Sequence, residues 1–521
     1  MFQRRDLLKW AGAGGIAAAF EPLAALGQTN ETNEVPVAKP ADAPAIADGF
    51  HQRLVREQAK ALAGQPYKGP SIDLPDPFRQ ISEDLYQGIH RHEDALIWRT
   101  NDTHFIVEPL LRGPLYTTQV DINLVVDGRV SSVACVNDDY DFGTIKLPAK
   151  PFMLGFSGFR ILQKGTDAPA MEIAKFQGAS LFRTKAVGQT FGTIARALAI
   201  RTADPRGEEF PQFRTFWIEQ PEKDSDTLVL HGVVDSPSMT GAFRFTLRPG
   251  FATIMDIECS LFARTQIDHL GIAAMSASFL YGTLGPRPVD RLRPRAYEIN
   301  GLQMHSGNGE WIWRPVNNRS SLQISVFADN NPKGFGFLQR DRDFALFQDN
   351  QQQDEKRPSL WVEPIGDWGE GSIDLVEIPS QGEFNENIVA YWRPKNTIAA
   401  GGEMNIAYRQ IWCWDIPDRH ELALVTSSRS GVGAKASWRK FAVDFSHPEF
   451  AQWPKDRPIQ ALLSLAKGRI TSQATYLMKD LHVFRCEFEL NPDVEPLCEI
   501  RLQLQAENRP ISETWLYRWT V

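Results

Sequence analysis

The distribution of apolar and polar positions along the chain predicts a structure made mostly of β-strands. Short runs either alternate in polarity or are continuously apolar, and Gly, Pro, Asn and Asp separate them. Clear cases are "DINLVVDG", "TLVLHGVVDS", "GAFRFTLRPGFATIMDIECSLFA", "SLQISVFAD" and "MNIAYRQIWCWD". These strands do not alternate with helices, so the pattern favours antiparallel sandwiches over a doubly wound sheet. One amphipathic helix is expected at about 46–63.

A change of pattern near residue 415 predicts a division into two domains. The stretch 415–433, "DIPDRHELALVTSSRSGVG", is rich in turn residues and loses the aromatic periodicity. The strand runs beyond it have the number and spacing of an immunoglobulin-like sandwich. We therefore predict an all-β chain with a large two-sheet domain at 46–414, a linker at 415–425 and an immunoglobulin-like domain at 426–521.

The first 45 residues read as an export signal and a tether. Arg4 and Arg5 precede a short, glycine-rich apolar run, and Ala25-Leu26-Gly27 has the small-x-small form of a cleavage site. The run is too short to span a bilayer, which takes about 20 residues. Residues 1–27 are therefore expected to be a twin-arginine signal peptide and 28–45 a flexible tether. This predicts a periplasmic protein without stable membrane insertion.

The composition argues against several classes of partner and of metal or disulfide site. The chain of 521 residues has a net charge of −8 and no long basic run, which argues against nucleic acid. Five cysteines without a C-x-x-C pair argue against a disulfide scaffold or structural zinc, and ten scattered histidines form no metal constellation. No metal or cofactor is expected. Cys486 and Cys498 flank a stretch that could be a hairpin, which leaves one bridge open.

Candidate chemistry gathers between residues 298 and 392, where several loops carry aromatic and charged residues. Each loop alone reads as a turn, and each aromatic residue alone reads as core. Together, aromatic platforms and convergent carboxylates suit a neutral carbohydrate with many hydroxyl groups. Cleavage of a glycosidic bond commonly needs a protonated carboxylic acid and a base that activates water. The candidate aromatic residues are Trp311, Phe335, Trp361, Trp368 and Trp392; the candidate charged residues are Glu298, Glu310, Asp341, Asp343, Arg357, Glu363, Glu383 and Glu386.

The stretch "SQGEFNENIVAYW" at 380–392 places two carboxylates three residues apart. Residues three apart in a strand point to opposite faces, whereas around a turn both can face one cleft. Glu383 and Glu386 can therefore cooperate only if "GEFNEN" is a loop, and Gly382 and the asparagines favour a loop.

Motifs in these loops identify a family resemblance. The motifs are "FQGASLFR", "GNGEWIWRP", "DNNPKGFGFLQRDRDF", "KRPSLWVEP", "GEFNENIVAYW" and "ISETWLY", in this order from about residue 150 to the C-terminus. With them the chain resembles the periplasmic osmoregulated glucan biosynthesis proteins G and D, and its twin-arginine leader is similar to that of the D branch. The resemblance implies a galactose-mutarotase-like β-sandwich followed by an immunoglobulin-like one.

The resemblance also implies an activity on β-1,2-linked glucan. Some members are inverting β-1,2-glucanases, and others are transglycosylases that close glucan rings. Their general acid is an aspartate in the motif G-E-T-x-D-N-I-V, whose place Glu386 takes here. A second aspartate, implicated in water activation, falls on Glu298. The candidate substrate contacts are Glu383, Asn387, Arg357, Trp361, Glu363, Trp368, Asn331, Lys333, Phe335, Asp341, Asp343, His305 and Trp311.

Both catalytic positions have changed from aspartate to glutamate, which keeps the acid but lengthens its arm. A misplacement of about 1 Å can cost a hundredfold in rate. Two functions therefore remain open: an inverting hydrolase or transglycosylase, and a non-catalytic protein that binds glucan or organises partners. A homodimer and contact with the glucan synthase machinery are the candidate protein partners.

Overall fold

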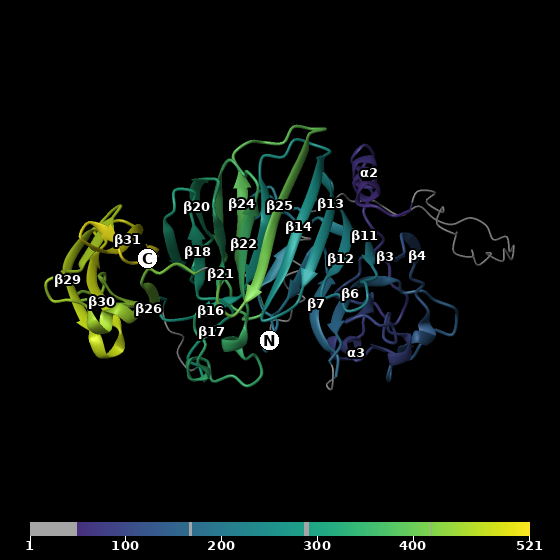
Figure 1. Cartoon of the computed structure of the whole chain (residues 1–521), viewed down its shortest axis with the longest axis horizontal. Helices are drawn as coiled ribbons and strands as arrows, with labels where there is room; N and C mark the ends of the chain where they lie inside the picture. Colours follow the sequence, from purple (N-terminus) through teal and green to yellow (C-terminus); the bar gives the residue numbers. More distant parts are fainter. Residues whose placement is uncertain (1–48, 166–168, 286–290, 418) are drawn as a thin grey trace, which may run out of the picture.

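The computed structural model describes residues 49–165, 169–285, 291–417 and 419–521, and in this part of the chain strands dominate (Figure 1). The first large sheet has ten strands. In spatial order these are β2 (Phe105–Leu111), β6 (Phe156–Gln163), β7 (Met171–Gln177), β8 (Leu181–Thr184), β9 (Ile194–Arg196), β15 (Leu270–Ala277), β24 (Ile388–Pro394), β23 (Glu370–Glu377) and β20 (Gln323–Asn330), with β10 (Ala199–Ile200) beside β15.

The second large sheet has fifteen strands and runs into the C-terminal part of the chain. Its order is β28 (Gln460–Leu465), β31 (Leu497–Ala506), β33 (Thr514–Thr520), β19 (Trp311–Pro315), β18 (Gly301–His305), β21 (Gly334–Leu338), β22 (Ser359–Ile365), β25 (Glu403–Cys413), β14 (Ala252–Ala263), β13 (Met239–Arg248), β12 (Leu228–Asp235), β11 (Gln212–Glu219), β3 (Asp121–Val126) and β4 (Arg129–Ser132), with β32 (Arg509–Pro510) on β31.

The remaining elements are small. A four-stranded sheet contains β26 (Leu424–Val432), β27 (Arg439–Ser446), β30 (Val483–Asn491) and β29 (Arg469–Met478). Two strand pairs are β1 (His90–Arg91) with β5 (Tyr140–Asp141), and β16 (Phe279–Tyr281) with β17 (Ala296–Tyr297). The helices are α2 (Gln52–Ala63) and α3 (Glu83–Gln87), and the short 3₁₀ turns are η1 (Glu93–Ala95), η2 (Asn137–Asp139), η3 (Phe344–Leu346), η4 (Asp354–Lys356), η5 (Pro448–Gln452) and η6 (Lys479–Leu481).

The alternating sequence pattern becomes the core between the two large sheets. In β13, Phe243 and Phe245 point inward and are buried, while Arg244 between them faces outward and pairs with Glu258. Phe245 meets Phe176 of the opposite sheet edge to face, with ring centroids 5.3 Å apart. The all-β class predicted from the sequence is therefore confirmed.

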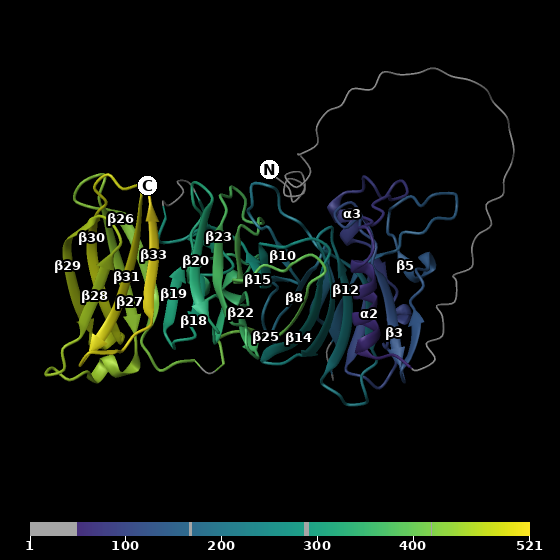
Figure 2. The ribbon, with the colours of Figure 1, turned by 90° about the horizontal axis from the view of Figure 1, so that it is seen from above.

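The predicted amphipathic helix is α2, which lies against the outer face of the second sheet (Figures 1 and 2). Val55 and Ala59 are its buried residues, and they pack in a small cluster with Trp217 and Phe262. The helix begins at Gln52, later than predicted; the expected first residues, 46–48, lie outside the described part of the chain. The leader and tether predicted at 1–45 also lie outside it and stay predictions.

The C-terminal strands are joined to the large sheet by direct strand pairing. β33 pairs in parallel with β19, with Ile312 opposite Thr514 and Trp313 opposite Trp515. The four-stranded sheet packs on the opposite side of a shared apolar core that contains both Phe441 and Trp313. Figure 1 shows these strands at one end of the molecule. The boundary predicted at 415–425 stays a prediction.

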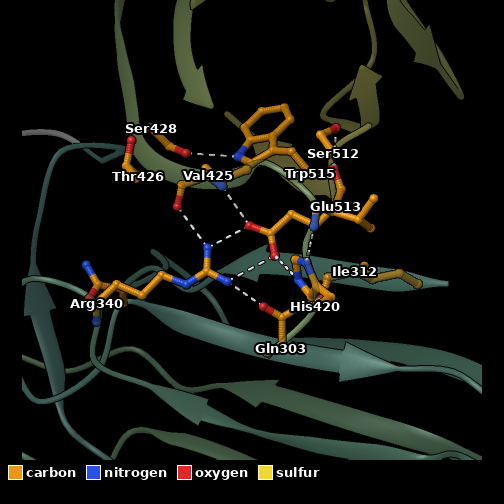
Figure 3. A network of polar contacts seen from close by, with 12 residues as sticks. Gln303, Ile312, Arg340, His420, Val425, Thr426, Ser428, Ser512, Glu513 and Trp515 are labelled. Carbon is orange, nitrogen blue, oxygen red and sulfur yellow. Dashed lines mark hydrogen bonds and ion pairs between the residues drawn. The ribbon is translucent and has the colours of Figure 1, made fainter. Parts of the chain in front are cut away.

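A buried polar network fixes the junction between these two parts (Figure 3). Glu513 is fully buried just before β33, and its carboxylate accepts hydrogen bonds from Arg340 Nη1 at 2.7 Å and Nη2 at 3.0 Å. Val425 N–H donates to the same carboxylate at 2.7 Å, and His420 Nε2 lies 3.6 Å from it. Burial alone would raise the pKa of Glu513, but Arg340 and the other donors outweigh burial and lower the pKa to about 2.

The bridge considered between Cys486 and Cys498 is wrong, because all five cysteines are free thiols. Cys486 lies on β30 of the four-stranded sheet, whereas Cys498 lies on β31 of the large sheet. The two strands follow each other in sequence but do not pair as a hairpin.

Candidate functional site

Four of the charged residues predicted for the site line one pocket of about 260 Å³: Glu298, Arg357, Glu383 and Glu386. The pocket forms where four segments meet. Glu298 directly follows β17, the loop between β23 and β24 carries Glu383 and Glu386, and Asp354 and Arg357 lie at the start and just after the end of the turn η4. Phe191, between β8 and β9, and Ile194, the first residue of β9, form an apolar wall.

The stretch from Ser380 to Asn387 is a loop, as the sequence predicted. Hydrogen bonds between polar groups within the loop stabilise its conformation. Ser380 Oγ donates to Gly382 O at 2.8 Å and accepts from Asn385 Nδ2 at 2.9 Å. This compact turn lets Glu383 and Glu386 face the same pocket, which a strand would have prevented.

Asn387 positions the loop from below and does not line the pocket. It is 3% exposed, and its side-chain amide forms hydrogen bonds with backbone groups. Its Oδ1 accepts from Phe279 N at 2.8 Å, and its Nδ2 donates to Phe279 O and Ile378 O. Asn387, predicted as a substrate contact, therefore lies outside the lining of the pocket. Its buried hydrogen bonds instead tie the carboxylate loop to β16.

Ser276 holds the carboxyl group of Glu386. Ser276 is fully buried on β15, and its Oγ donates to Glu386 Oε2 at 2.9 Å. This hydrogen bond ties the Glu386 side chain to β15. Ser276 is not among the residues predicted for the site; its sequence signal is a serine at 276 and another at 278 within an otherwise apolar run.

Burial dominates the environment of the Glu298 carboxyl group. Its Oε2 accepts from Ser278 N at 3.1 Å, and its Oε1 lies 4.0 Å from Arg357 Nε. Burial raises the pKa of Glu298, Arg357 and the Ser278 N–H oppose that rise, and the charge of Glu386 adds to it. The net effect is a pKa above the usual range of a glutamate. Burial likewise raises the pKa of the neighbouring Asp354.

Glu383 is already paired. Arg293 forms an ion pair with it and also donates to Asp349 Oδ2 at 2.5 Å. Arg293 could not be predicted from the sequence pattern, because 90 residues separate it from Glu383 and no local spacing links the two. The structure thus adds Ser276, Arg293 and Asp354 to the residues that shape the site.

The residues predicted to form an aromatic platform do not line the carboxylate pocket. Phe335 and Trp392 are fully buried, Trp361 is 3% exposed and Trp368 is 8% exposed, and none of them lines the carboxylate pocket. Trp361 lies against Gly334, where any side chain would collide with its ring. The first glycine of the motif "KGFGF" is therefore explained by close packing against the Trp361 ring. The aromatic residues that do line the pocket are Phe191, Tyr297 and the half-exposed Phe384.

Other predicted contacts lie elsewhere in the described structure. Asp341 lines a neighbouring cavity on the other side of Tyr297 and accepts from Asn300 Nδ2 at 2.9 Å. Asp343 caps the turn η3 by accepting from Ala345 N. Asn331 caps the turn that carries Trp368, accepting from its N–H at 2.9 Å. Glu363 lies on β22 opposite Arg409.

His305, Trp311 and Lys333 form a separate group at the far ends of β18, β19 and β21. The rings of His305 and Trp311 stack with centroids 4.0 Å apart, and Lys333 N donates to His305 O at 2.9 Å. Burial, with help from the charge of Lys333, lowers the pKa of His305 to about 4. Their predicted role at the carboxylates is not supported by this placement.

The pocket is therefore equipped for acid–base chemistry on a polar substrate. It holds three glutamates, and the charge of one of them, Glu386, contributes to the raised pKa of Glu298. Two carboxyl groups in different environments can carry an acid role and a base role in one reaction.

In the described part of the chain, no helix combines the length and the apolar character needed to cross a membrane.

Comparison with known proteins places the chain in a family. Residues 50–519 match the model of the family described as periplasmic glucan biosynthesis protein, MdoG. The glucans biosynthesis protein G of Rhodopseudomonas palustris is 37% identical over 483 residues, covering 92% of this chain and 95% of its own. The protein of the same name from Shewanella baltica OS155 is 37% identical over 525 residues, covering 97% and 96%.

A galactose mutarotase related enzyme from Lactobacillus acidophilus is a structural neighbour at 8% identity and a TM-score of 0.20, covering 46% of this chain and 96% of its own. Similarity to the D branch depends on the leader sequence and stays a prediction. The sequence match alone settles the relationship: this chain belongs to the MdoG family of periplasmic glucan biosynthesis proteins.

Proposed function

We propose that this protein acts on β-1,2-linked glucan in the periplasm as an inverting glycoside hydrolase or a transglycosylase. The observation that carries the proposal is the meeting of Glu298, Glu383 and Glu386 with Arg357 in one pocket, although 88 positions separate the first glutamate from the last. The substrate class comes from the family. The geometry supports acid–base cleavage of a neutral sugar chain.

In this mechanism Glu386 protonates the glycosidic oxygen as the bond breaks. Glu298 removes a proton from the attacking group on the opposite side of the sugar, directly or through water. Inverting enzymes keep the two carboxyl groups about 6.5–9.5 Å apart to admit a water molecule. A raised pKa makes ionised Glu298 a stronger base at neutral pH. Attack by water gives hydrolysis, and attack by a sugar hydroxyl gives transfer.

The longer glutamate arm has local support. Ser276 holds the Glu386 carboxyl from β15, so the extra methylene does not leave the acid free to rotate. Preorganisation of this kind is what a displaced acid needs in order to act. The change from aspartate therefore does not by itself exclude activity.

A product screen tests the proposal. The protein is incubated with linear β-1,2-, β-1,3- and β-1,6-glucans, and the products are followed by chromatography and by NMR of the new anomeric centre. We expect products from the β-1,2-glucan alone, with the α-anomer formed first if water attacks. Absence of any product from the β-1,2-glucan, or release of the β-anomer first, contradicts the mechanism.

Removal of Arg357 should change the pH profile. The guanidinium group favours the ionised form of Glu298, so Arg357→Gln raises the pKa of Glu298 further. The base must be ionised to work, and we therefore expect the acidic limb of kcat/KM to move to higher pH. Arg183→Gln is the matched control, because Arg183 lines the same pocket and stacks on Phe191. An acidic limb that stays in place in Arg357→Gln contradicts the role of Glu298.

A second function has a specific observation in its favour. Glu383 is occupied by Arg293, and Glu386 is held by Ser276, which suits a pocket that binds and orients glucan without cleaving it. In that case the protein organises glucan synthesis, with the C-terminal domain as a docking module for the synthase machinery or for a second copy. Calorimetry that shows tight oligosaccharide binding without turnover favours this function.

A further inference from the structure

A second cavity of about 410 Å³ lies directly beyond the carboxylate pocket, and one arginine stands between the two. Arg293 and Asp349 line this second cavity, together with Tyr281 and Gln348. Glu383, the partner of Arg293, lines the carboxylate pocket. The ion pair between Arg293 and Glu383 therefore crosses the boundary between the two cavities.

Arg293 is fixed on several sides. Its Nη1 donates to Asp349 at 2.5 Å, a different nitrogen pairs with Glu383, and its backbone carbonyl accepts from Tyr281 OH at 3.1 Å. The side chains of Arg293, Asp349 and Glu383 are only 20%, 13% and 26% exposed. A guanidinium group that bridges two carboxylates in this way has little rotational freedom.

The bridge continues into the wall of the carboxylate pocket. Asp349 Oδ1 accepts from Gln352 N at 3.1 Å, and Gln352 Oε1 accepts from Arg357 Nη2 at 3.0 Å. Arg357 in turn faces Glu298. The position of Arg293 is thus coupled by hydrogen bonds to the residue that faces the candidate base.

A neutral sugar chain offers no charge that this ion pair could neutralise. The pair instead fills space and uses up the hydrogen-bonding capacity of Glu383, at the place where a longer chain would pass from one cavity into the next. We propose that Arg293 is a specificity-determining residue that closes one end of the carboxylate pocket and so limits how many sugar units lie on that side of the cleaved bond. This inference depends on the glucan-directed function proposed above.

The test measures binding as a function of chain length. Linear β-1,2-gluco-oligosaccharides of increasing length are titrated by calorimetry into Glu386→Gln protein, with and without Arg293→Ala. With Arg293 present, affinity should stop rising at a short length. Arg293→Ala joins the two cavities, and we expect affinity to rise over further units, ending roughly three- to tenfold tighter for the longest chain. The same substitution in the active protein should lengthen the products.

Arg291→Ala is the matched control. Arg291 lines the same second cavity two residues away, and within the described residues it has no carboxylate partner. It should keep the wild-type plateau. Arg293→Lys retains the charge but cannot bridge two carboxylates with separate nitrogens. The chain length at which its affinity stops rising should lie between the lengths for wild type and Arg293→Ala. This variant also guards against a folding defect in the alanine variant.

The outcomes separate this inference from the proposed function. If Arg293→Ala does not change how oligosaccharide affinity depends on chain length, the role of Arg293 is overturned and the glucan-directed function still stands. A plateau that shifts in Arg293→Ala supports the role of Arg293 even if the active protein releases no product. No binding of any oligosaccharide by any variant overturns both.

Discussion

Replacement of Glu386 by glutamine should reduce turnover of linear β-1,2-glucan by about 10²- to 10⁴-fold, the usual contribution of a general acid. The amide keeps the size of the side chain and can still face Ser276, whose Oγ contacts Glu386 Oε2 at 2.9 Å, but it has no proton to deliver to the leaving oxygen. Initial rates of product release, measured by chromatography for wild type and variant, give the comparison.

Two controls make this result specific. Glu370→Gln changes an exposed glutamate at the start of β23, where it pairs with Lys395, and should leave the rate unchanged. A β-glucosyl substrate with an acidic aryl leaving group needs little protonation, so Glu386→Gln should lose much less rate on that substrate than on glucan. Equal product release from wild type and Glu386→Gln contradicts the assignment of Glu386 as the acid.

Replacement of Glu513 by glutamine should destabilise the protein by about 3 kcal/mol at neutral pH. The substitution leaves the guanidinium group of Arg340 without its anionic partner in a buried site. Its other contacts, Val425 O and Gln303, cannot neutralise the charge. The free energy of unfolding from urea titrations, followed by tryptophan fluorescence, measures the loss; Trp515 lies in the same junction (Figure 3).

The pH dependence of the loss is a sharper test. The pKa of Glu513 falls from its ordinary 4.5 to about 2 in the folded protein, so the folded state favours the ionised carboxylate. The stabilisation is fully present above pH 4.5 and disappears as the pH falls from there towards 2. The difference between wild type and Glu513→Gln should therefore shrink over this range. A difference that is independent of pH contradicts an ionic origin.

Glu495→Gln is the control for the same kind of substitution in the same part of the chain. Glu495 pairs with Lys467 on the surface, where the two side chains are 31% and 59% exposed. Solvent screens such a pair, and its loss should change the stability by less than about 1 kcal/mol. A loss as large as that of Glu513→Gln would mean that burial does not explain the strength of the junction.

Local sequence patterns predicted the strands, the helix α2 and the carboxylate loop. Strand alternation needs only that one face is buried and the other is not, as in β13 with Phe243, Arg244 and Phe245. The loop at "GEFNEN" could be predicted because Gly382 and the asparagines prefer turns and supply their own hydrogen bonds. The pairing of Glu298 with Glu386 came from the family resemblance, and the structure brings both to one pocket.

The aromatic residues show where sequence patterns stop being informative. A tryptophan in a glycine-rich loop can stack on a sugar or pack in the core, and its neighbours in sequence are the same in both cases. Burial of Trp361 and Trp368 is decided by strands that arrive from elsewhere in the chain, and by Gly334, which leaves room for the Trp361 ring. The sequence pattern placed these tryptophans at the substrate, whereas the structure buries them outside the lining of the carboxylate pocket.

The sequence by itself determined the fold class and the family, because both follow from residue patterns and motifs along the chain, and the family resemblance singled out the two carboxylates with their lengthened arms. The tertiary structure alone decided that Ser276 holds Glu386, that Arg293 occupies Glu383 and that Glu513 anchors the C-terminal strands to Arg340. These pairs join residues 110, 90 and 173 positions apart. Contacts over such separations follow from the order of strands in the sheets, and only the folded chain sets that order.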